Sequence, residues 1–305
     1  MMEKNEMEFD EEMNKRCCAA EEVIRSYLPA EEGYQKTLIE AMNYSIRSGG
    51  KRLRPMMMYA SAEMFGTPVK MIEPFMAAIE MIHTYSLVHD DLAAMDNDEY
   101  RRGKRTTHAV YGEGMGVLAG DGLLNYAFET ALKSFDLTSD NDDKERCLKA
   151  LKILADKAGI YGMAGGQGAD IESDNTGESS EELLMFIHEH KTAAMIQSAM
   201  MIGAVLQGAS DADVSKIEES AFHIGIAFQI RDDILDVTST KEILGKTTGK
   251  DVQEHKLTYV SMHGIPEAEK QVEVHSERAE MLLSEVGMGD GFLMELIGRL
   301  VGRDK

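Results

Sequence analysis

The chain has few residues of the kinds that build disulfide-stabilised or metal-cysteine proteins. Its 305 residues include no tryptophan, five prolines and three cysteines, namely Cys17, Cys18 and Cys147. Adjacent cysteines rarely pair with each other, and no pair has the spacing of a metal site. We therefore exclude a disulfide framework and expect a reduced, cytoplasmic setting.

Positive charge is also scarce. Lysine and arginine number 32 against 54 acidic residues, which gives a net charge of −22. This balance argues against a nucleic-acid partner and against a polybasic membrane patch. The longest apolar stretch, residues 193–206, contains Gln197 and Ser198 and is too short to span a bilayer, so we expect no membrane anchor.

Helical patterns dominate what is present. No proline lies between Pro74 and Pro266, and no sustained period-2 run of β-branched residues occurs. Apolar residues recur at helical spacing in residues 76–89 and 217–234. These patterns predict an all-α protein of roughly ten helices in a single domain, residues 1–305. Breaks are predicted near residues 49–50, 96–103, 137–143, 174–180, 208–213 and 238–249.

Two segments gather carboxylates directly after an apolar helical run. They are residues 89–99 and residues 229–236. Carboxylates held so close repel one another, and a divalent cation would relieve that repulsion. Oxygen ligands favour a hard ion such as Mg²⁺, which commonly shares substrate phosphates. The alternative is that both segments are solvated helix ends on an acidic protein.

The two segments differ in geometry. Asp232 and Asp236 are four residues apart, so they differ by only about 40° around a helix. Asp90 and Asp96 are six apart, which is about 240°. If both serve one ion, the helix must bulge or end between them.

Two basic clusters stand out against the acidic background, at residues 49–55 and 101–105. Lys51 and Arg54 are three residues apart and would face one way if that segment is helical. Glycines just before them would let the backbone approach an anion, and arginine matches phosphate oxygens bidentately. The alternative is surface charge that balances nearby acids.

Taken together, these motifs resemble the trans-isoprenyl diphosphate synthase family, in particular the bacterial-type farnesyl and geranylgeranyl diphosphate synthases. The resemblance extends from about Tyr34 to the C-terminus. The motifs that carry it, in the family's order, are residues 49–55, 83–102, 120–121, 165–167, 191–192, 228–236, 245–251 and 256–259.

The resemblance implies the isoprenoid synthase fold, a bundle of about ten to twelve helices around a deep central cavity, usually in a homodimer. It also implies a prenyltransferase that condenses isopentenyl diphosphate with dimethylallyl or geranyl diphosphate through an allylic carbocation. About three Mg²⁺ ions, for which Mn²⁺ can substitute, would surround the allylic diphosphate. The implied metal ligands are Asp90, Asp91, Asp96 and Asp232.

The resemblance also assigns residues to the two diphosphates. The implied contacts of the allylic diphosphate or its metal ions are Arg101, Lys191, Gln229, Lys246 and Lys256. The implied contacts of isopentenyl diphosphate are Lys51, Arg54, His83 and Arg102. Lys191, Thr192 and Gln229 would also steady the carbocation through their dipoles.

Product length depends in this family on the residues four and five before the first aspartate, here Ser86 and Tyr85. Five residues are about 7.5 Å of helix, so a tyrosine there would form a floor one turn below the metal site. This resemblance favours a C15 product, farnesyl diphosphate, over C20. Ordinary core packing is the alternative role for Tyr85.

Several positions depart from the subgroup's pattern. Ala93 and Arg105 stand where proline is usual, and Glu99-Tyr100 where Asp-Leu is usual. None of these replaces an implied metal or diphosphate ligand. The basic tail, residues 303–305, is a weak candidate for closing the site.

The alternatives to a C15 synthase are a C20 synthase, a terpene cyclase and a non-catalytic helical subunit. Cyclases usually lack the basic motif that Lys51 and Arg54 supply. A non-catalytic relative would be expected to have lost an aspartate of the first motif or Arg102.

Overall fold

The computed structural model describes residues 2–238, 258–287 and 291–301. The chain forms two compact units, one of residues 1–59 with 69–151 and the other of residues 60–68 with 152–305. The prediction of a single domain stays a prediction, and each unit is described on its own.

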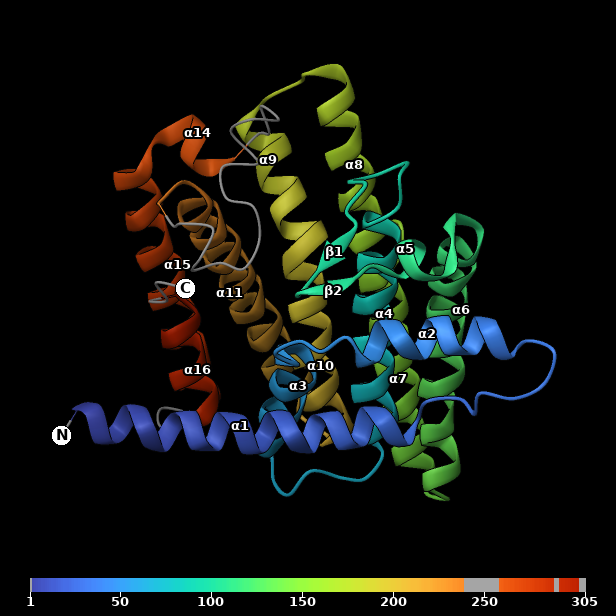
Figure 1. The fold of residues 1–305 in the computed structure, drawn as a ribbon. Coiled ribbons are helices and arrows are strands. Elements are labelled where there is room, and N and C mark those ends of the chain that lie inside the picture. The colour runs from blue at the N-terminus through green and yellow to red at the C-terminus, as the bar shows by residue number, and fades with distance from the viewer. Residues whose placement is uncertain (1, 239–257, 288–290, 302–305) are drawn as a thin grey trace. The chain divides into compact units, whose positions relative to one another are not determined.

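The first unit is helical except for a short hairpin (Figure 1). Its elements are α1 (Met2–Ser26), α2 (Lys36–Arg47), α4 (Ile72–Asp90), β1 (Tyr100–Arg101), β2 (Lys104–Arg105), α5 (Thr107–Tyr111), α6 (Glu113–Leu132) and the 3-10 helix η1 (Lys133–Leu137). Two further helices, α3 (Leu53–Glu63) and α7 (Asn141–Ala158), belong in part to each unit.

Helix α4 is the centre of the first unit. It packs along α6 and also contacts α1 and α2 (Figure 1). Thirteen of its nineteen residues are buried, because it is apolar on nearly every side. Its C-terminal end carries His89 and Asp90, so the core of the unit fixes the position of the first acidic segment.

The second unit is also helical. Its elements are α8 (Met163–Thr176), α9 (Glu181–Ile187), the π-helix η2 (His188–Ala193), α10 (Ala194–Leu206), α11 (Asp211–Thr238), α14 (Tyr259–His263), α15 (Ile265–Val286) and α16 (Phe292–Val301). All thirteen residues of α10 are buried, which accounts for the longest apolar run in the sequence. Helix α11 packs along α15 and against α10 (Figure 1).

The prediction of an all-α protein is confirmed, and no described helix is long and apolar enough to cross a membrane. The predicted breaks near residues 49–50, 96–103, 137–143, 174–180 and 208–213 all separate helices. One short hairpin was not predicted: β1 and β2 pair antiparallel at residues 100–105. Two-residue strands are too short to show a period-2 pattern. The last predicted break, after Thr238, lies outside the described residues.

Two histidines join α11 to α15. The Nδ1 atoms of His223 and His275 lie 2.8 Å apart, so one ring donates a hydrogen bond and the other accepts it. Beside them, Arg278 forms an ion pair with Glu219. Burial, with a smaller contribution from His223, lowers the pKa of His275 to about 4, and burial also lowers the pKa of His223.

We expect this pair to make the protein acid-sensitive. An unfolded histidine binds a proton near pH 6.5, whereas folded His275 resists it until about pH 4. The unfolded state therefore binds more protons in this window, and the free energy of unfolding falls as pH drops, by about 1–2 kcal/mol once solvent screening is taken into account. Urea unfolding between pH 4 and 7 should show a shallower slope for His275→Gln. An unchanged slope would contradict this account.

Candidate active site

The first acidic segment begins where α4 ends. The backbone N–H of Asp96 donates to the carbonyl of Asp90 at 2.8 Å, and that of Asp98 donates to the carbonyl of Asp91 at 3.1 Å. The chain therefore turns back after Asp90 instead of continuing as a helix. This confirms the expectation that the helix ends between Asp90 and Asp96, and it holds the backbones of these residues close together.

The hairpin after this turn carries basic side chains back toward the acidic segment. Its two turn residues, Arg102 and Gly103, have φ of 54° and 74°, as a type I′ turn requires. The paired strand residue Arg101 donates from Nε to Asp91 Oδ1 at 2.7 Å. The break predicted at residues 96–103 is thus the element that positions Arg101.

Asp91 is a buried carboxylate that has a cation as its partner. It is 4% exposed, and burial raises its pKa although Arg101 acts in the opposite direction. Asp90, the preceding residue, ends α4 and is half-buried. The charged form of a buried carboxylate that lies near other carboxylates is stabilised by an additional cation. Asp91 therefore has the electrostatic surroundings expected of a metal ligand.

The loop before α3 is not helical at Lys51, so the condition for a common face of Lys51 and Arg54, a helical segment, is not met. Gly49, Gly50 and Arg52 have φ of 91°, 143° and 50°, which reverses the chain just before α3 begins at Leu53. Lys51 is exposed on this loop, whereas Arg54 lies in the first turn of α3. The two side chains are positioned separately.

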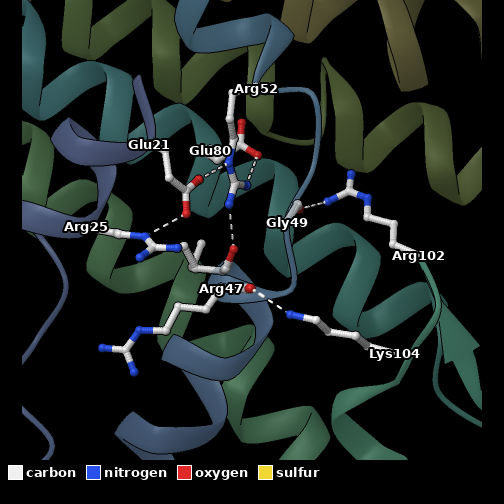
Figure 2. A network of polar contacts seen from close by, with 9 residues as sticks. Glu21, Arg25, Arg47, Gly49, Arg52, Glu80, Arg102 and Lys104 are labelled. Atoms are coloured by element: carbon white, nitrogen blue, oxygen red, sulfur yellow. Dashed lines mark hydrogen bonds and ion pairs between the residues drawn. The ribbon is translucent and has the colours of Figure 1, made fainter. Parts of the chain in front are cut away.

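Side chains of the hairpin hold this loop from one side (Figure 2). Arg102 donates from Nη1 to the carbonyl of Gly49, and Lys104 donates from Nζ to the carbonyl of Arg47 at 3.1 Å. A Cβ at Gly50 would overlap the guanidinium of Arg102. Gly50 therefore leaves space for the side chain of Arg102. The sequence alone had suggested only that this glycine lets the backbone approach an anion.

Arg54, His83 and Arg102 gather at one place in the first unit, and we call them the Arg–His cluster. Burial, followed by the charges of Arg54 and Arg102, holds the pKa of His83 well below its usual value. Burial lowers the pKa of both arginines, and each experiences the charge of the other. The Nε of Arg54 is buried without a hydrogen-bond partner among the described residues. Arg54 and His83 are half-buried and Arg102 is exposed. Positive side chains gathered at one place, with no ion pair from Arg54 or Arg102 to a carboxylate among the described residues, suit an anion.

In the second unit, the predicted residues Lys191 and Thr192 lie on the π-helix η2. Lys191 forms an ion pair with Asp170 of α8 at 2.5 Å. Thr192 donates from Oγ1 to Gln229 Oε1 at 2.9 Å, and Gln229 donates from Nε2 to Asp233 Oδ1 at 3.3 Å. The Thr192–Gln229 hydrogen bond links η2 to α11, and the Gln229–Asp233 hydrogen bond lies within α11.

Two glycines hold η2 between neighbouring helices. A Cβ at Gly166 of α8 would overlap the backbone nitrogen of Lys191, and a Cβ at Gly225 of α11 would overlap Ala193. The π-turn itself was not predicted, although π-turns are frequent at functional sites. The glycine pair at residues 165–166 was the sequence signal for a close helix contact here.

The second acidic segment ends α11 as the sequence predicted. Asp232 is half-buried, while Asp233 and Asp236 are buried. Asp233 accepts a hydrogen bond from the backbone N–H of Tyr259 at 2.8 Å, so it joins α11 to α14. One oxygen of Asp236 is buried without a partner among the described residues. Sequence reasoning missed the structural role of Asp233. Lys246 and Lys256 lie outside the described residues, as does the tail at 303–305.

The proposed floor residues lie one turn before the acidic segment. Tyr85 is 9% exposed, and its ring contacts the His89 ring edge-on with centroids 5.8 Å apart. Burial and the charge of Asp90 raise the pKa of the Tyr85 hydroxyl. Ser86 donates from its hydroxyl to the carbonyl of His83 at 2.9 Å.

Known proteins are similar to this chain in sequence and in fold. The polyprenyl synthetase family model matches residues 35–283. The chain is 40% identical to a farnesyl diphosphate synthase of Geobacillus stearothermophilus over 301 residues, which cover 97% of this chain and 98% of that one. It is 42% identical to a geranylgeranyl diphosphate synthase of Cyanophora paradoxa, with 85% of each chain covered.

A solved structure agrees with these sequence matches. A geranyltransferase of Helicobacter pylori, described as complexed with magnesium and isoprenyl diphosphate, superposes with a TM-score of 0.80 at 31% identity over 95% of each chain. The chain belongs to the polyprenyl synthetase family. This polyprenyl synthetase has the isoprenoid synthase fold that the sequence resemblance implied, and its relatives are prenyltransferases.

The close packing of α8 on η2 gives a test by matched variants of the polyprenyl synthetase. Gly166→Ala should lower the free energy of unfolding by about 1–3 kcal/mol, because the new Cβ meets backbone that cannot yield. It should also lower turnover by moving Lys191. Gly168→Ala, on the same helix with open space around it, should leave activity unchanged and stability equal or higher by up to about 1 kcal/mol. Equal effects of the two substitutions in urea unfolding would contradict the close packing of α8 on η2 at Gly166.

Proposed function

We propose that this polyprenyl synthetase condenses isopentenyl diphosphate head-to-tail with dimethylallyl and geranyl diphosphates and stops at farnesyl diphosphate (C15). The single observation that carries the proposal is the Arg–His cluster. The cluster gathers two arginines and a histidine, with the Nε of Arg54 buried and unpartnered among the described residues, in the same unit as the first acidic segment. A cationic site would bind the diphosphate of one substrate directly, and a carboxylate site would bind the diphosphate of the other through metal ions.

We assign the diphosphate of isopentenyl diphosphate to the Arg–His cluster, with Lys51 at its exposed edge. The arginine forks would bind phosphate oxygens bidentately. His83 is neutral at pH 7 because its pKa is depressed, so it would donate one N–H without adding charge. This end of the substrate would stay bound while its double bond reacts.

The allylic diphosphate is assigned to the acidic segments. Asp90, Asp91, Asp96 and Asp232 would hold Mg²⁺, and their all-oxygen donor set fits that ion. The buried oxygen of Asp236, unpartnered among the described residues, also suits a nearby cation. No three His, Cys, Asp or Glu side chains of the described residues form a complete ligand cluster, so water and substrate phosphate would complete the coordination. When bound, Mg²⁺ neutralises the charge that develops on the leaving diphosphate.

The protein's own side chains would do the rest. Arg101 would bind the leaving diphosphate from beside Asp91, with Lys246 and Lys256 assigned to the same group. Lys191, Thr192 and Gln229 would present dipoles to the allylic cation. The double bond of isopentenyl diphosphate attacks that cation, and a proton then leaves to the departed diphosphate. An apolar cavity would keep water from quenching the cation.

A homodimer is part of the proposal. Helix α6 exposes Val117, Leu118 and Leu132, each more than 40% accessible. Exposed apolar side chains gathered on one helix commonly mark a protein interface. Size-exclusion chromatography with light scattering would distinguish a dimer from a monomer. The cytoplasmic location stays a prediction.

Product analysis tests the proposed function directly. The protein is incubated with isopentenyl diphosphate, Mg²⁺ and each allylic starter (C5, C10 and C15), and products are identified by mass. We expect C15 from the C5 and C10 starters and little C20. A dominant C20 product would support the second candidate, a geranylgeranyl diphosphate synthase, which the Cyanophora relative favours. No condensation by folded protein would reject both, and a cyclic hydrocarbon from a single allylic substrate would indicate a terpene cyclase.

The length assignment depends on Tyr85. Tyr85→Ala removes a buried ring one turn before the first aspartate, so we expect the product mixture to shift toward C20 or longer. Tyr85→Phe, which keeps the ring, should still give C15. If Tyr85→Ala makes only C15, the tyrosine is ordinary core packing and not the floor.

A further inference from the structure

Arg52 stands in the middle of the basic motif, but its side chain is bonded to groups inside the protein and is not free to bind a substrate anion. Its side chain is 1% exposed. Three of its nitrogens donate at 2.6 Å: Nε to Glu21, Nη1 to Glu80 and Nη2 to the carbonyl of Ile46 (Figure 2). The guanidinium therefore joins α1, α4 and the end of α2, and its charge is used inside the protein.

Arg52 also holds an unusual backbone conformation. Its φ of 50° lies in the left-handed region, which is unfavourable for a residue other than glycine. Such a conformation persists only where surrounding contacts hold it. The three hydrogen bonds of the side chain stabilise this conformation. Helix α3 begins at the next residue, Leu53, so the conformation of Arg52 also sets where Arg54 lies.

Glu80 is the partner that makes Arg52 important for the site. It is 2% exposed and lies three residues before His83, so both share one face of α4. Its negative charge also acts on Arg54 and Arg102 and raises the pKa of each against the effect of burial. A buried carboxylate thus lies within electrostatic reach of both arginines of the Arg–His cluster.

We propose that Arg52 is a positioning residue: its ion pair holds Glu80 away from the Arg–His cluster and keeps both arginines of that cluster available for the diphosphate of isopentenyl diphosphate. Without Arg52, the buried carboxylate would take the nearest remaining guanidinium, because an unpaired buried charge is strongly unfavourable. Glu80 would then compete with the substrate as an internal anion. This inference rests on the proposed function, which names the anion.

A merely structural role makes a different prediction. If Arg52 only filled space and tied three helices together, removing Glu80 as well would do further damage. If Glu80 is the competitor, removing it should repair the defect that the loss of Arg52 causes. The sign of the interaction between the two substitutions separates these roles.

The test is a double-mutant cycle of Arg52→Gln, Glu80→Gln and both together, with Arg25→Gln as the matched control. Arg25 donates to the other carboxylate oxygen of Glu21 at 2.8 Å, and we assign it no role in the site. Michaelis constants for isopentenyl diphosphate and geranyl diphosphate are measured separately, and melting temperatures report folding. Condensation by the wild-type protein is the positive control; if it is absent, the proposed function fails and not this inference.

We expect Arg52→Gln to raise the KM for isopentenyl diphosphate about tenfold or more while the KM for geranyl diphosphate changes less than about threefold. Adding Glu80→Gln should restore most of the affinity. Glu80→Gln alone should leave the KM for isopentenyl diphosphate equal or lower, and Arg25→Gln should change neither constant. A double variant that binds isopentenyl diphosphate no better than Arg52→Gln would overturn the proposal, as would an equal rise in both Michaelis constants. If Arg52→Gln does not fold, a Glu80→Gln enzyme with a raised KM for isopentenyl diphosphate would overturn it as well.

Discussion

The buried ion pair of Arg52 and Glu80 is the interaction on which the first unit's site depends. Arg52 belongs to a loop in which three residues have positive φ, and the charge of Glu80 acts on Arg54 and Arg102. Without a dedicated partner for Glu80, this carboxylate and those arginines would neutralise one another, and no anion site would remain. The site is therefore built by separating charges that would otherwise pair.

In each unit, several residues to which we assign roles lie where the backbone departs from a regular α-helix. In the first unit, α4 ends at Asp90 and a type I′ hairpin brings Arg101 back to Asp91. In the second, a π-turn carries Lys191 and Thr192, and glycines on two neighbouring helices allow it to be held closely. The cores of both units are ordinary buried helices, whereas Asp91 lies where α4 ends and Lys191 and Thr192 lie where the helix changes pitch. This arrangement combines a rigid scaffold with side chains in positions that a regular helix could not present.

The sequence predicted much of this because its signals were local. Helical spacing and the scarcity of proline predicted the all-helical class, whereas the isoprenoid synthase fold was implied by the resemblance. One ion shared by Asp90 and Asp96 required a bulge or an end of the helix between them, and the structure contains that end. What could not be predicted depends on contacts between distant segments. Lys51 and Arg54 do not share a helix face, because left-handed residues precede α3. Arg52 looks like its basic neighbours in the sequence, and only the positions of α1 and α4 show that its charge is paired and buried.

The central claim is that isopentenyl diphosphate binds to side-chain cations alone, whereas the allylic diphosphate needs metal held by carboxylates. Isothermal titration of the full-length protein with each substrate, in excess EDTA and then in Mg²⁺, tests it most directly. We predict that isopentenyl diphosphate binds with similar affinity in both conditions and that geranyl diphosphate binds only with Mg²⁺. Loss of isopentenyl diphosphate binding in EDTA would contradict the account, because it would show that the Arg–His cluster does not suffice as an anion site.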